Sequence, residues 1–479
     1  MAKTKTIYVC AECGQAAPRW LGRCPSCNSW GSLAEERAPS TNATKLSTRT
    51  AAAAVAGAAG VGRAVTLSEI PPDSARRIST EIPELDRVLG GGPVVGGVIL
   101  VGGDPGIGKS TLLLQALGGV ASSGENTLYI SGEESSAQVA LRARRMAGIG
   151  IERVRVLAAT DLDEIEAALS RETPRAVVVD SIQTMRAGEL ESPAGSVGQL
   201  REVTARLVDL AKARGLALFL IGHVTKEGAI AGPKVLEHLV DTVLAFEGDS
   251  TLNYRIVRST KNRFGPANEL GVFEMREDGL HGVTDPSRLF LAERPLNAAG
   301  SVVVPTAQGQ RPLLVEVQAL VAPAAYGSAR RVATGLDSQR LAMLLAVLER
   351  KAQVQVLDQD VFVSAVGGAR VDEPAIDLAL AVAITSSLRE RAVPHDTVVF
   401  GEVGLTGEVR GVPRASQRLD EARKLGFRRA IVPASIIERL RPNESAGIEL
   451  VGVRDVSSAL RSAFERSAGP TTLSKGRSS

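Results

Sequence analysis

The stretch that decides the fold is Gly103-Asp104-Pro105-Gly106-Ile107-Gly108-Lys109-Ser110, which matches the pattern GxxxxGK[ST] without a gap. It follows an apolar run at residues 98–101 and precedes a helical run that begins near Thr111. A strand, a loop of this kind and a helix are the context in which the pattern holds nucleotide phosphates. Its glycines let backbone N–H groups wrap the phosphates, while Lys109 neutralises charge and the Ser110 hydroxyl binds Mg²⁺. The sequence therefore predicts an ATP site at residues 103–111, with a chance glycine-rich turn as the alternative.

Short apolar runs recur on both sides of this loop and predict a sheet. They lie at residues 98–101, 127–130, 176–179, 217–221 and 242–246. Helical runs such as residues 112–122 and 197–213 separate the first four of them. Alternation of this kind predicts an α/β fold with a mainly parallel sheet and helices on both faces. We expect this domain to span residues 65–289.

Carboxylates follow two of the predicted strands at the edge where the phosphates should lie. Asp180 ends the run 176–179 and is the expected partner of Mg²⁺. Glu133 and Glu134 follow the run 127–130, and carboxyl ends of parallel strands face the ligand site. Glu133 is the first candidate for the base that orients the attacking water, and Glu134 is the second. Ordinary solvated loop carboxylates are the alternative for all three.

A further polar segment follows the run 217–221. His223, Thr225 and Lys226 lie there, in a glycine-rich stretch that extends to residue 233. We expect a polar group at this place to sense the γ-phosphate and to pass its state to the following segment. A histidine that only caps the core is the alternative.

The four cysteines of the chain form two pairs near its start. Cys10 and Cys13 make one CxxC, and Cys24 and Cys27 make the other after ten residues. Two such turns that converge on one tetrahedral site predict a structural Zn²⁺, although the intervening loop is shorter than usual. Four thiolates leave no open position, so the metal should fold residues 1–30 rather than catalyse. Disulfides and a redox CxxC are the alternatives.

Composition excludes several classes of protein. The chain has 479 residues with 44% hydrophobic and 23% charged residues, which is typical of a globular protein of about three domains. The net charge of +3 shows no global basic excess, so any nucleic-acid surface must be a local patch. No uncharged stretch in the N-terminal third is long enough to cross a membrane, and the apolar stretch after residue 5 is too short for a signal peptide. We expect a cytoplasmic protein.

The remaining regions are a linker, a third domain and a tail. Residues 31–64 are rich in Ala, Ser, Thr and Gly and predict a flexible linker. Residues 290–464 mix strands such as 313–320 with an apolar helix near 376–387. Residues 465–479 form a basic tail.

Taken together, the motifs resemble one bacterial family, the RadA (Sms) DNA repair proteins. The order is the four-cysteine module, the sequence STEIPELDRVLGGG at residues 79–92, the P-loop, and then Lys261-Asn262-Arg263-Phe264-Gly265. The pentapeptide KNRFG behind such a core is far more specific than the P-loop. The resemblance covers nearly the whole chain.

The resemblance implies a RecA-like P-loop ATPase core in a hexameric ring that binds single-stranded and branched DNA. It implies branch migration of recombination intermediates alongside the RecA recombinase, with coupling of hydrolysis to DNA supported by KNRFG. Lys261 and Arg263 are then candidates for cations that reach a neighbour's γ-phosphate in trans. A basic turn anchored by Phe264 is the alternative.

The third domain resembles the α+β proteolytic domain of Lon. The matching pieces are residues 372–375 before the apolar helix and residues 404–412. Where Lon proteases carry a nucleophilic Ser and a Lys, this chain has Ala375 and, with a less certain alignment, Arg418. Alanine offers no nucleophile and arginine is too basic to act as a base, so we expect no peptidase activity. Arg410, Arg414, Arg418, Arg423 and Lys424 form a basic run that is either a phosphate-binding surface or plain surface charge.

Two functions from other classes remain as alternatives to a DNA motor. One is an ATPase switch that resembles the KaiC family, which shares the glutamate pair. The other is an active Lon-type protease, which Ala375 opposes. DNA-stimulated hydrolysis would separate the motor from the switch.

Overall fold

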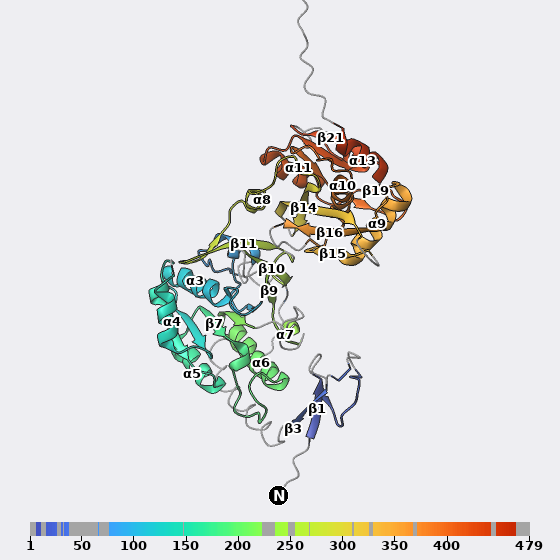
Figure 1. Ribbon diagram of the computed structural model, residues 1–479. Helices are drawn as coiled ribbons and strands as arrows, with labels where there is room; N and C mark the ends of the chain where they lie inside the picture. Colours follow the sequence, from blue (N-terminus) through green and yellow to red (C-terminus); the bar gives the residue numbers. More distant parts are fainter. Residues whose placement is uncertain are drawn as a thin grey trace, which may run out of the picture. The chain divides into compact units, whose positions relative to one another are not determined.

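The computed structural model describes most of the chain in two compact units, Met1–Val283 and Thr284–Ser479 (Figure 1). The described residues are 6–10, 16–25, 30–31, 33–37, 66, 76–146, 148–222, 235–247, 254–267, 269–308, 311–324, 329–366, 371–441 and 447–465. The division lies a few residues before the predicted one at 289, because helix α8 (Pro286–Phe290) packs on the second unit. There, Ser287 Oγ donates to Glu421 and accepts from the amide of Leu314.

The first unit is built on a nine-stranded sheet. Its strand order is β12-β11-β10-β9-β4-β8-β7-β5-β6. The six strands from β9 to β6 are parallel, and β10, β11 and β12 extend the sheet antiparallel. The strands are β4 (Val98–Gly102), β5 (Thr127–Ser131), β6 (Arg155–Ala158), β7 (Ala176–Asp180), β8 (Ala217–Ile221), β9 (Thr242–Glu247), β10 (Tyr254–Asn262), β11 (Leu270–Arg276) and β12 (Gly279–Gly282).

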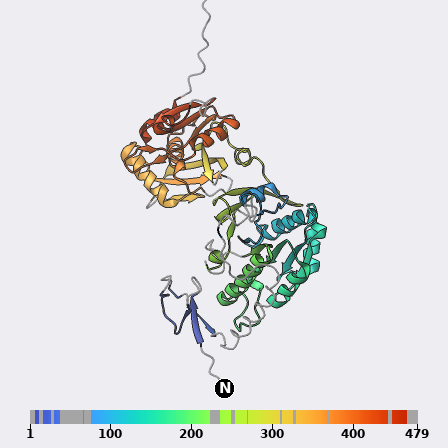
Figure 2. The same cartoon turned by 180° about the vertical axis from the view of Figure 1, so that it is seen from behind.

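Helices cover both faces of this sheet, which confirms the predicted α/β architecture (Figures 1 and 2). Alternate strand residues point to opposite faces, so Ile99 and Val101 pack in one core and Val98 and Leu100 in the other. The first core includes residues of α2 (Pro83–Val88), α3 (Lys109–Ser122) and α4 (Ser136–Ala143). The second includes residues of α5 (Leu162–Glu172), α6 (Val197–Arg214) and α7 (Val235–Leu239).

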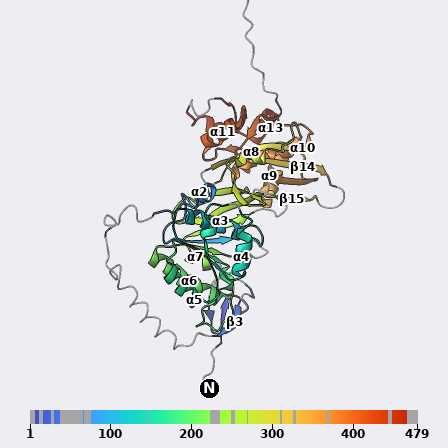
Figure 3. The same ribbon diagram turned by 90° about the vertical axis from the view of Figure 1, so that its left-hand side faces the viewer.

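The second unit has a mixed sheet around one core, seen from another side in Figure 3. Its strand order is β15-β16-β14-β13-β17-β20-β21. The strands are β13 (Ser301–Gln308), β14 (Arg311–Pro323), β15 (Arg331–Thr334), β16 (Gln359–Ala365), β17 (Thr397–Val399), β20 (Arg429–Pro433) and β21 (Glu449–Val453), with a separate hairpin of β18 (Glu402–Val403) and β19 (Val409–Arg410). The predicted strand 313–320 lies within β14.

The apolar helix predicted near 376–387 is α10 (Asp377–Leu388), and it is buried along nearly its whole length. It packs on β13 and β14 and contacts α9 (Ser338–Lys351) and α13 (Val456–Phe464). Helices α11 (Ala415–Lys424) and α12 (Ala434–Ile437) complete the unit. None of the helices within the described residues is both long and apolar enough to span a membrane.

A small three-stranded sheet lies near the start of the chain. It has the order β2-β1-β3, with β1 (Thr6–Cys10), β2 (Ala16–Ala17) and β3 (Leu33–Arg37). Cys10 and Cys24 are buried there together with Ala17 and Leu33.

Candidate nucleotide-binding site

The P-loop joins β4 to α3, as the motif predicts. Strand β4 ends at Gly102 and α3 begins at Lys109. Gly108 has a φ of 114°, and a Cβ at this position would lie 2.8 Å from Met275 Cε. A residue with a side chain would therefore be strained and crowded at the point where the loop turns into the helix.

Lys109 lies inside the loop and is 4% exposed. Its Nζ donates to the carbonyl oxygens of Gly103 at 2.7 Å and Asp104 at 2.9 Å. Burial lowers the pKa of Lys109, and the nearby charge of Asp180 opposes this shift in part. A buried ammonium that has only loop carbonyls in place of water fits an anionic ligand, because phosphate oxygens are stronger acceptors.

Asp180 ends β7 and lies beside Ser131 at the end of β5. Strand β8 separates β7 from the P-loop strand, so both carboxyl ends open on the same edge of the sheet. Asp180 is 7% exposed, and its peptide bond to Ser181 is cis. A hydroxyl at Ser110 and a carboxylate at Asp180 are hard oxygen donors, which suit Mg²⁺ when phosphates supply further ligands.

The two glutamates after β5 have different surroundings. Glu133 is exposed, accepts a hydrogen bond from Ser181 Oγ at 2.5 Å, and contributes to the electrostatic field at Lys109. Glu134 instead forms an ion pair with Arg142, with 2.9 Å between Oε2 and Nη2. The structure thus brings Glu133 toward Lys109 and Asp180, while the charge of Glu134 is neutralised by Arg142 of α4.

Three residues at this edge were missed by sequence reasoning. Arg255 of β10 is 6% exposed, and its Nε donates to the Ile107 carbonyl of the P-loop at 3.1 Å. Tyr129 of β5 donates its hydroxyl hydrogen to Asp180 Oδ2, and Arg142 Nη2 donates to the Tyr129 hydroxyl at 2.9 Å. Burial and the Asp180 charge raise the pKa of Tyr129 well above its ordinary value. Tyr129 gave one sequence signal, a hydroxyl inside the apolar run 127–130, whereas Arg142 and Arg255 lie outside the predicted apolar runs.

The KNRFG segment lies at the opposite end of the parallel strands from the P-loop, where β9 and β4 begin. Lys261 and Asn262 end β10 and pair with Val243 and Thr242 at the start of β9. Thr242 in turn pairs with Ile99 near the start of β4, whereas the P-loop follows the end of that strand. Ile99, which lies beside the KNRFG segment, is three residues of extended chain from Gly102, where β4 ends. This is a separation of roughly 10 Å, to which the length of the P-loop is added.

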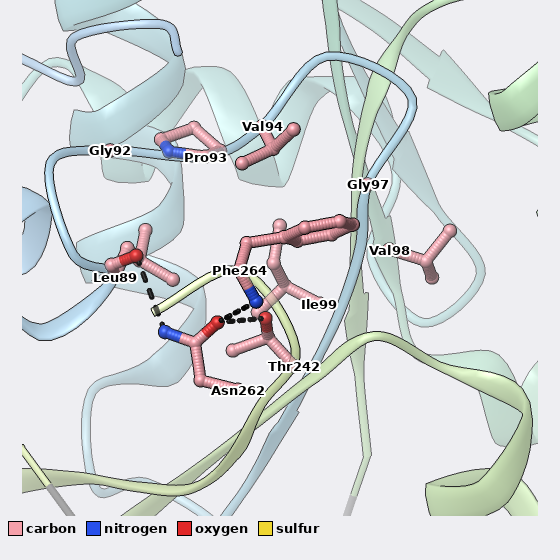
Figure 4. A pocket seen from close by; sticks show the side chains of 10 residues that line it. All are labelled: Leu89, Gly92, Pro93, Val94, Gly97, Val98, Ile99, Thr242, Asn262 and Phe264. Carbon is pink, nitrogen blue, oxygen red and sulfur yellow. Dashed lines mark hydrogen bonds between the residues drawn. The ribbon is translucent and has the colours of Figure 1, made fainter. Parts of the chain in front are cut away.

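The turn after β10 is held against the segment that precedes β4 (Figure 4). Asn262 donates to the Leu89 carbonyl at 3.3 Å, and its Oδ1 accepts from the Phe264 amide and the Thr242 hydroxyl. Arg77 donates to the carbonyls of Leu89 and Phe264. The sequence motif at 79–92 and the KNRFG motif are therefore packed on each other, and Gly265 lies next to Gly90.

The two cations of KNRFG have partners within the chain. Lys261 Nζ donates to the carbonyls of Glu237 at 2.5 Å and Val240 at 2.8 Å, at the end of α7. Burial and the nearby Arg263 lower the pKa of Lys261. Arg263 is 52% exposed and forms an ion pair with Asp241 at 3.2 Å. Arg263 is thus the more accessible of the two.

Some predicted site residues lie outside the described residues. They are His223, Thr225, Lys226, Cys13 and Cys27. The other two cysteines, Cys10 and Cys24, are buried in one small cluster. Two buried thiols from separate segments fit a shared zinc site, because a metal gives them a polar partner.

The second unit has an alanine at the place of the Lon nucleophile. Ala375 is 1% exposed in the short helix η7 (Pro374–Ile376). Arg418 is 0% exposed and binds both carboxylate oxygens of Glu373, at 2.9 Å and 2.5 Å. The suggestion that Arg418 belongs to a basic surface is therefore wrong, because its guanidinium is occupied inside the core.

The other members of that basic run are on the surface, mostly beside carboxylates. Arg410 pairs with Glu408, Arg423 with Asp420, and Lys424 with Glu421. Arg414 is exposed at the start of α11. These pairs offset most of the positive charge that the sequence suggested for this surface.

Comparison with known proteins places three segments of the chain. Residues 8–35 match the family described as a rubredoxin metal binding domain, and residues 64–229 match an AAA domain. Residues 340–436 match subunit ChlI of Mg-chelatase. A KaiC-like protein from the archaeon Pyrococcus horikoshii aligns with a TM-score of 0.37 and 20% identity, over 44% of this chain and 99% of its own.

Several bacterial proteins are similar to this chain over nearly its whole length. The DNA repair protein RadA of Pseudomonas aeruginosa is 50% identical, over 97% of this chain and 100% of its own. RadA of Escherichia coli is 48% identical over 96% and 99%, and RadA of Bacillus subtilis is 46% identical over 97% and 100%. With such identity across nearly the whole length, on an ATPase core with a zinc ribbon before it, this chain belongs to the RadA family of DNA repair proteins.

Proposed function

We propose that the chain is a DNA-dependent ATPase of recombinational repair that acts as a hexameric ring in the cytoplasm. Its ligands are single-stranded and branched DNA, and it drives branch migration of recombination intermediates together with the RecA recombinase. Membership of the RadA family supports the role in DNA repair. The match of residues 64–229 to an AAA domain supports ATP as the nucleotide that is hydrolysed.

One observation carries the ring proposal. The P-loop and the KNRFG cations lie at opposite edges of one sheet, so the cations cannot serve the P-loop of their own chain. A head-to-tail arrangement of identical subunits brings the unlike ends of the strands together, and it forms a ring when the rotation between subunits closes. In such a ring, Arg263 and Lys261 of one subunit face the nucleotide of the next.

The residues around the nucleotide then have distinct roles. Lys109 and the loop amides bind the phosphates, and Glu133 orients the attacking water. Ser110 and Asp180 would hold Mg²⁺, which would supply further positive charge for the phosphates. A cation from the next subunit stabilises charge that develops only in the transition state.

DNA contact is assigned to the channel side of the ring. The stretch 225–233 follows β8 in the sequence, and its glycines suit close backbone approach to phosphates. Lys226 is its one cation. We assign the zinc module, held by Cys10, Cys13, Cys24 and Cys27, to a structural role.

The test is the ATPase rate of the full chain with and without single-stranded DNA, at one fixed salt concentration. DNA is expected to raise the rate, and Lys109→Ala is expected to abolish it because the charge at the transferring phosphate is gone. A rate that ignores DNA would overturn the motor and favour a switch. Hydrolysis that persists in Lys109→Ala would overturn the P-loop assignment.

A further inference from the structure

A line of polar contacts runs from the partly exposed Glu134 to the buried Asp180, and the groups that lead to Asp180 have no part in the function proposed so far. Arg142 of α4 forms an ion pair with Glu134 at 2.9 Å and donates to the Tyr129 hydroxyl at 2.9 Å. The Tyr129 hydroxyl donates to Asp180 Oδ2. Four side chains from β5, α4, the loop after β5 and β7 are thereby joined in one line.

The chemistry of each contact determines which group donates the hydrogen bond and which accepts it. A tyrosine hydroxyl has one hydrogen to donate, and the carboxylate of Asp180 can only accept. Because Arg142 has donors and no acceptor, the Tyr129 hydroxyl accepts from Arg142 and gives its hydrogen to Asp180. The arginine also stacks over the Tyr129 ring at 5.6 Å, which holds both groups in place.

The consequence for Asp180 is a fixed orientation. Tyr129 is 0% exposed on the strand beside β7, so its ring cannot turn away from the carboxylate. The hydrogen bond occupies Oδ2, and within the described part of the chain no hydrogen bond to Oδ1 is formed. Oδ1 is thus left for a ligand, in a carboxylate whose charge acts on Lys109.

We infer that Tyr129 is a positioning residue for Asp180, and that Glu134 and Arg142 act through it rather than on the nucleotide. This inference rests on the proposed function, in which Asp180 holds Mg²⁺. Groups that orient a metal ligand are as much a part of a metal site as the ligand itself. Of the two glutamates, only Glu133 then orients the attacking water.

The central experiment is a comparison of Tyr129→Phe with the unaltered full chain. The readout is Mn²⁺ binding in the presence of a non-hydrolysable ATP analogue, followed by the electron paramagnetic resonance of free Mn²⁺. Loss of a group that orients a metal ligand is expected to weaken Mn²⁺ binding about tenfold. The Mg²⁺ concentration for half-maximal ATPase should rise in parallel, while the rate at saturating Mg²⁺ recovers. Tyr254→Phe, half-buried on β10 of the same sheet, is the matched control and should change neither value.

A second pair of variants separates the two glutamates. Glu134→Gln should weaken Mn²⁺ binding in the same direction as Tyr129→Phe. Glu133→Gln should lose turnover with Mn²⁺ binding unchanged. If Tyr129→Phe folds poorly, Arg142→Met replaces it, because Arg142 is partly exposed and its loss removes the donor that directs the Tyr129 hydroxyl hydrogen toward Asp180.

Each possible outcome decides the inference. Mn²⁺ binding by Tyr129→Phe equal to that of Tyr254→Phe, with Asp180→Asn clearly weakened, overturns the role of Tyr129 and leaves the proposed function standing. A lower melting temperature and a lower rate at every Mg²⁺ concentration, without a change in Mn²⁺ binding, mean a structural role only and also overturn it. Unchanged Mn²⁺ binding in Asp180→Asn overturns the Mg²⁺ assignment, and the inference falls with it.

Discussion

At the scale of single residues, Arg418 shows how burial decides the meaning of a charge. Its guanidinium binds Glu373 through two nitrogens, donates to the Pro305 and Pro413 carbonyls, and stacks on Phe400 at 5.9 Å. Within a run of basic residues it looked like a surface cation, but the Arg418 side chain is 0% exposed and makes these contacts within the second unit. Its place in the structure indicates a role in stability.

The first prediction concerns this pair. Arg418→Ala leaves the Glu373 carboxylate without its partner, and breaking a buried pair in this way costs about 3–5 kcal/mol. Glu373 is 20% exposed, so the lower end of that range is expected here. Urea unfolding of the full chain measures the loss.

The matched control is Arg414→Ala, one turn earlier and exposed, which should change stability by no more than about 0.5 kcal/mol. Equal stability of the two variants, with weaker DNA binding by Arg418→Ala alone, would restore the phosphate-contact role.

At the scale of elements, helix α3 contains two glycines that helix propensity disfavours. Gly118 and Gly119 lie in its middle and are buried. A Cβ on Gly119 would lie 1.9 Å from the Thr80 carbonyl oxygen, and a Cβ on Gly118 would lie 2.7 Å from Ile151 Cγ1. The helix that starts at the P-loop is thus packed directly against the backbone of the 79–92 motif.

The second prediction follows from that contact. Propensity alone would make Gly119→Ala more stable by about 1 kcal/mol. Because the methyl group has no room, we expect a loss of roughly 1–3 kcal/mol instead. The melting temperature of the ATPase transition checks the sign.

Gly188→Ala is the control, since Gly188 is exposed and a Cβ there would meet no atom within 4 Å. A gain in stability for Gly119→Ala would mean that α3 and residue 80 are not in contact.

Elements differed in how far the sequence could predict them. The central strands β4, β5, β7, β8 and β9 were predictable because each is an apolar run buried on both faces. Strand β6 was not, because it is an edge strand of mixed exposure and has no such run. The P-loop residues were predicted from the spacing of their motif, and Asp180 from its place at the end of an apolar run. Tyr129 required the register between β5 and β7, since its partner Asp180 is 51 residues away in sequence. Lys261 was predicted as a site residue, but its contacts with the Glu237 and Val240 carbonyls were not, because these lie more than 20 residues away.

At the scale of the whole molecule, a single chain does not bring its KNRFG cations to its own phosphate loop. The phosphate loop and the KNRFG cations lie at the two ends of β4, and the chain holds Lys261 and Arg263 against its own α7 and Asp241. For either cation to reach a neighbour, it must leave these contacts. Arg263 is half exposed and forms one ion pair with the residues that the structure describes, so it gives up less than Lys261 does. We therefore expect Arg263 to carry more of the effect on hydrolysis.

The most direct test of shared hydrolysis mixes two inactive variants of the full chain. Arg263→Ala keeps an intact P-loop, and Lys109→Ala keeps an intact cation at the opposite edge. Each variant alone should assemble into rings but hydrolyse little ATP in the presence of single-stranded DNA. In mixed rings, some interfaces join an intact P-loop to an intact Arg263, so the account predicts that part of the DNA-dependent ATPase activity returns. Mixed rings that form and yet regain no activity would contradict it, and would mean that Arg263 only stabilises its own chain through the ion pair with Asp241.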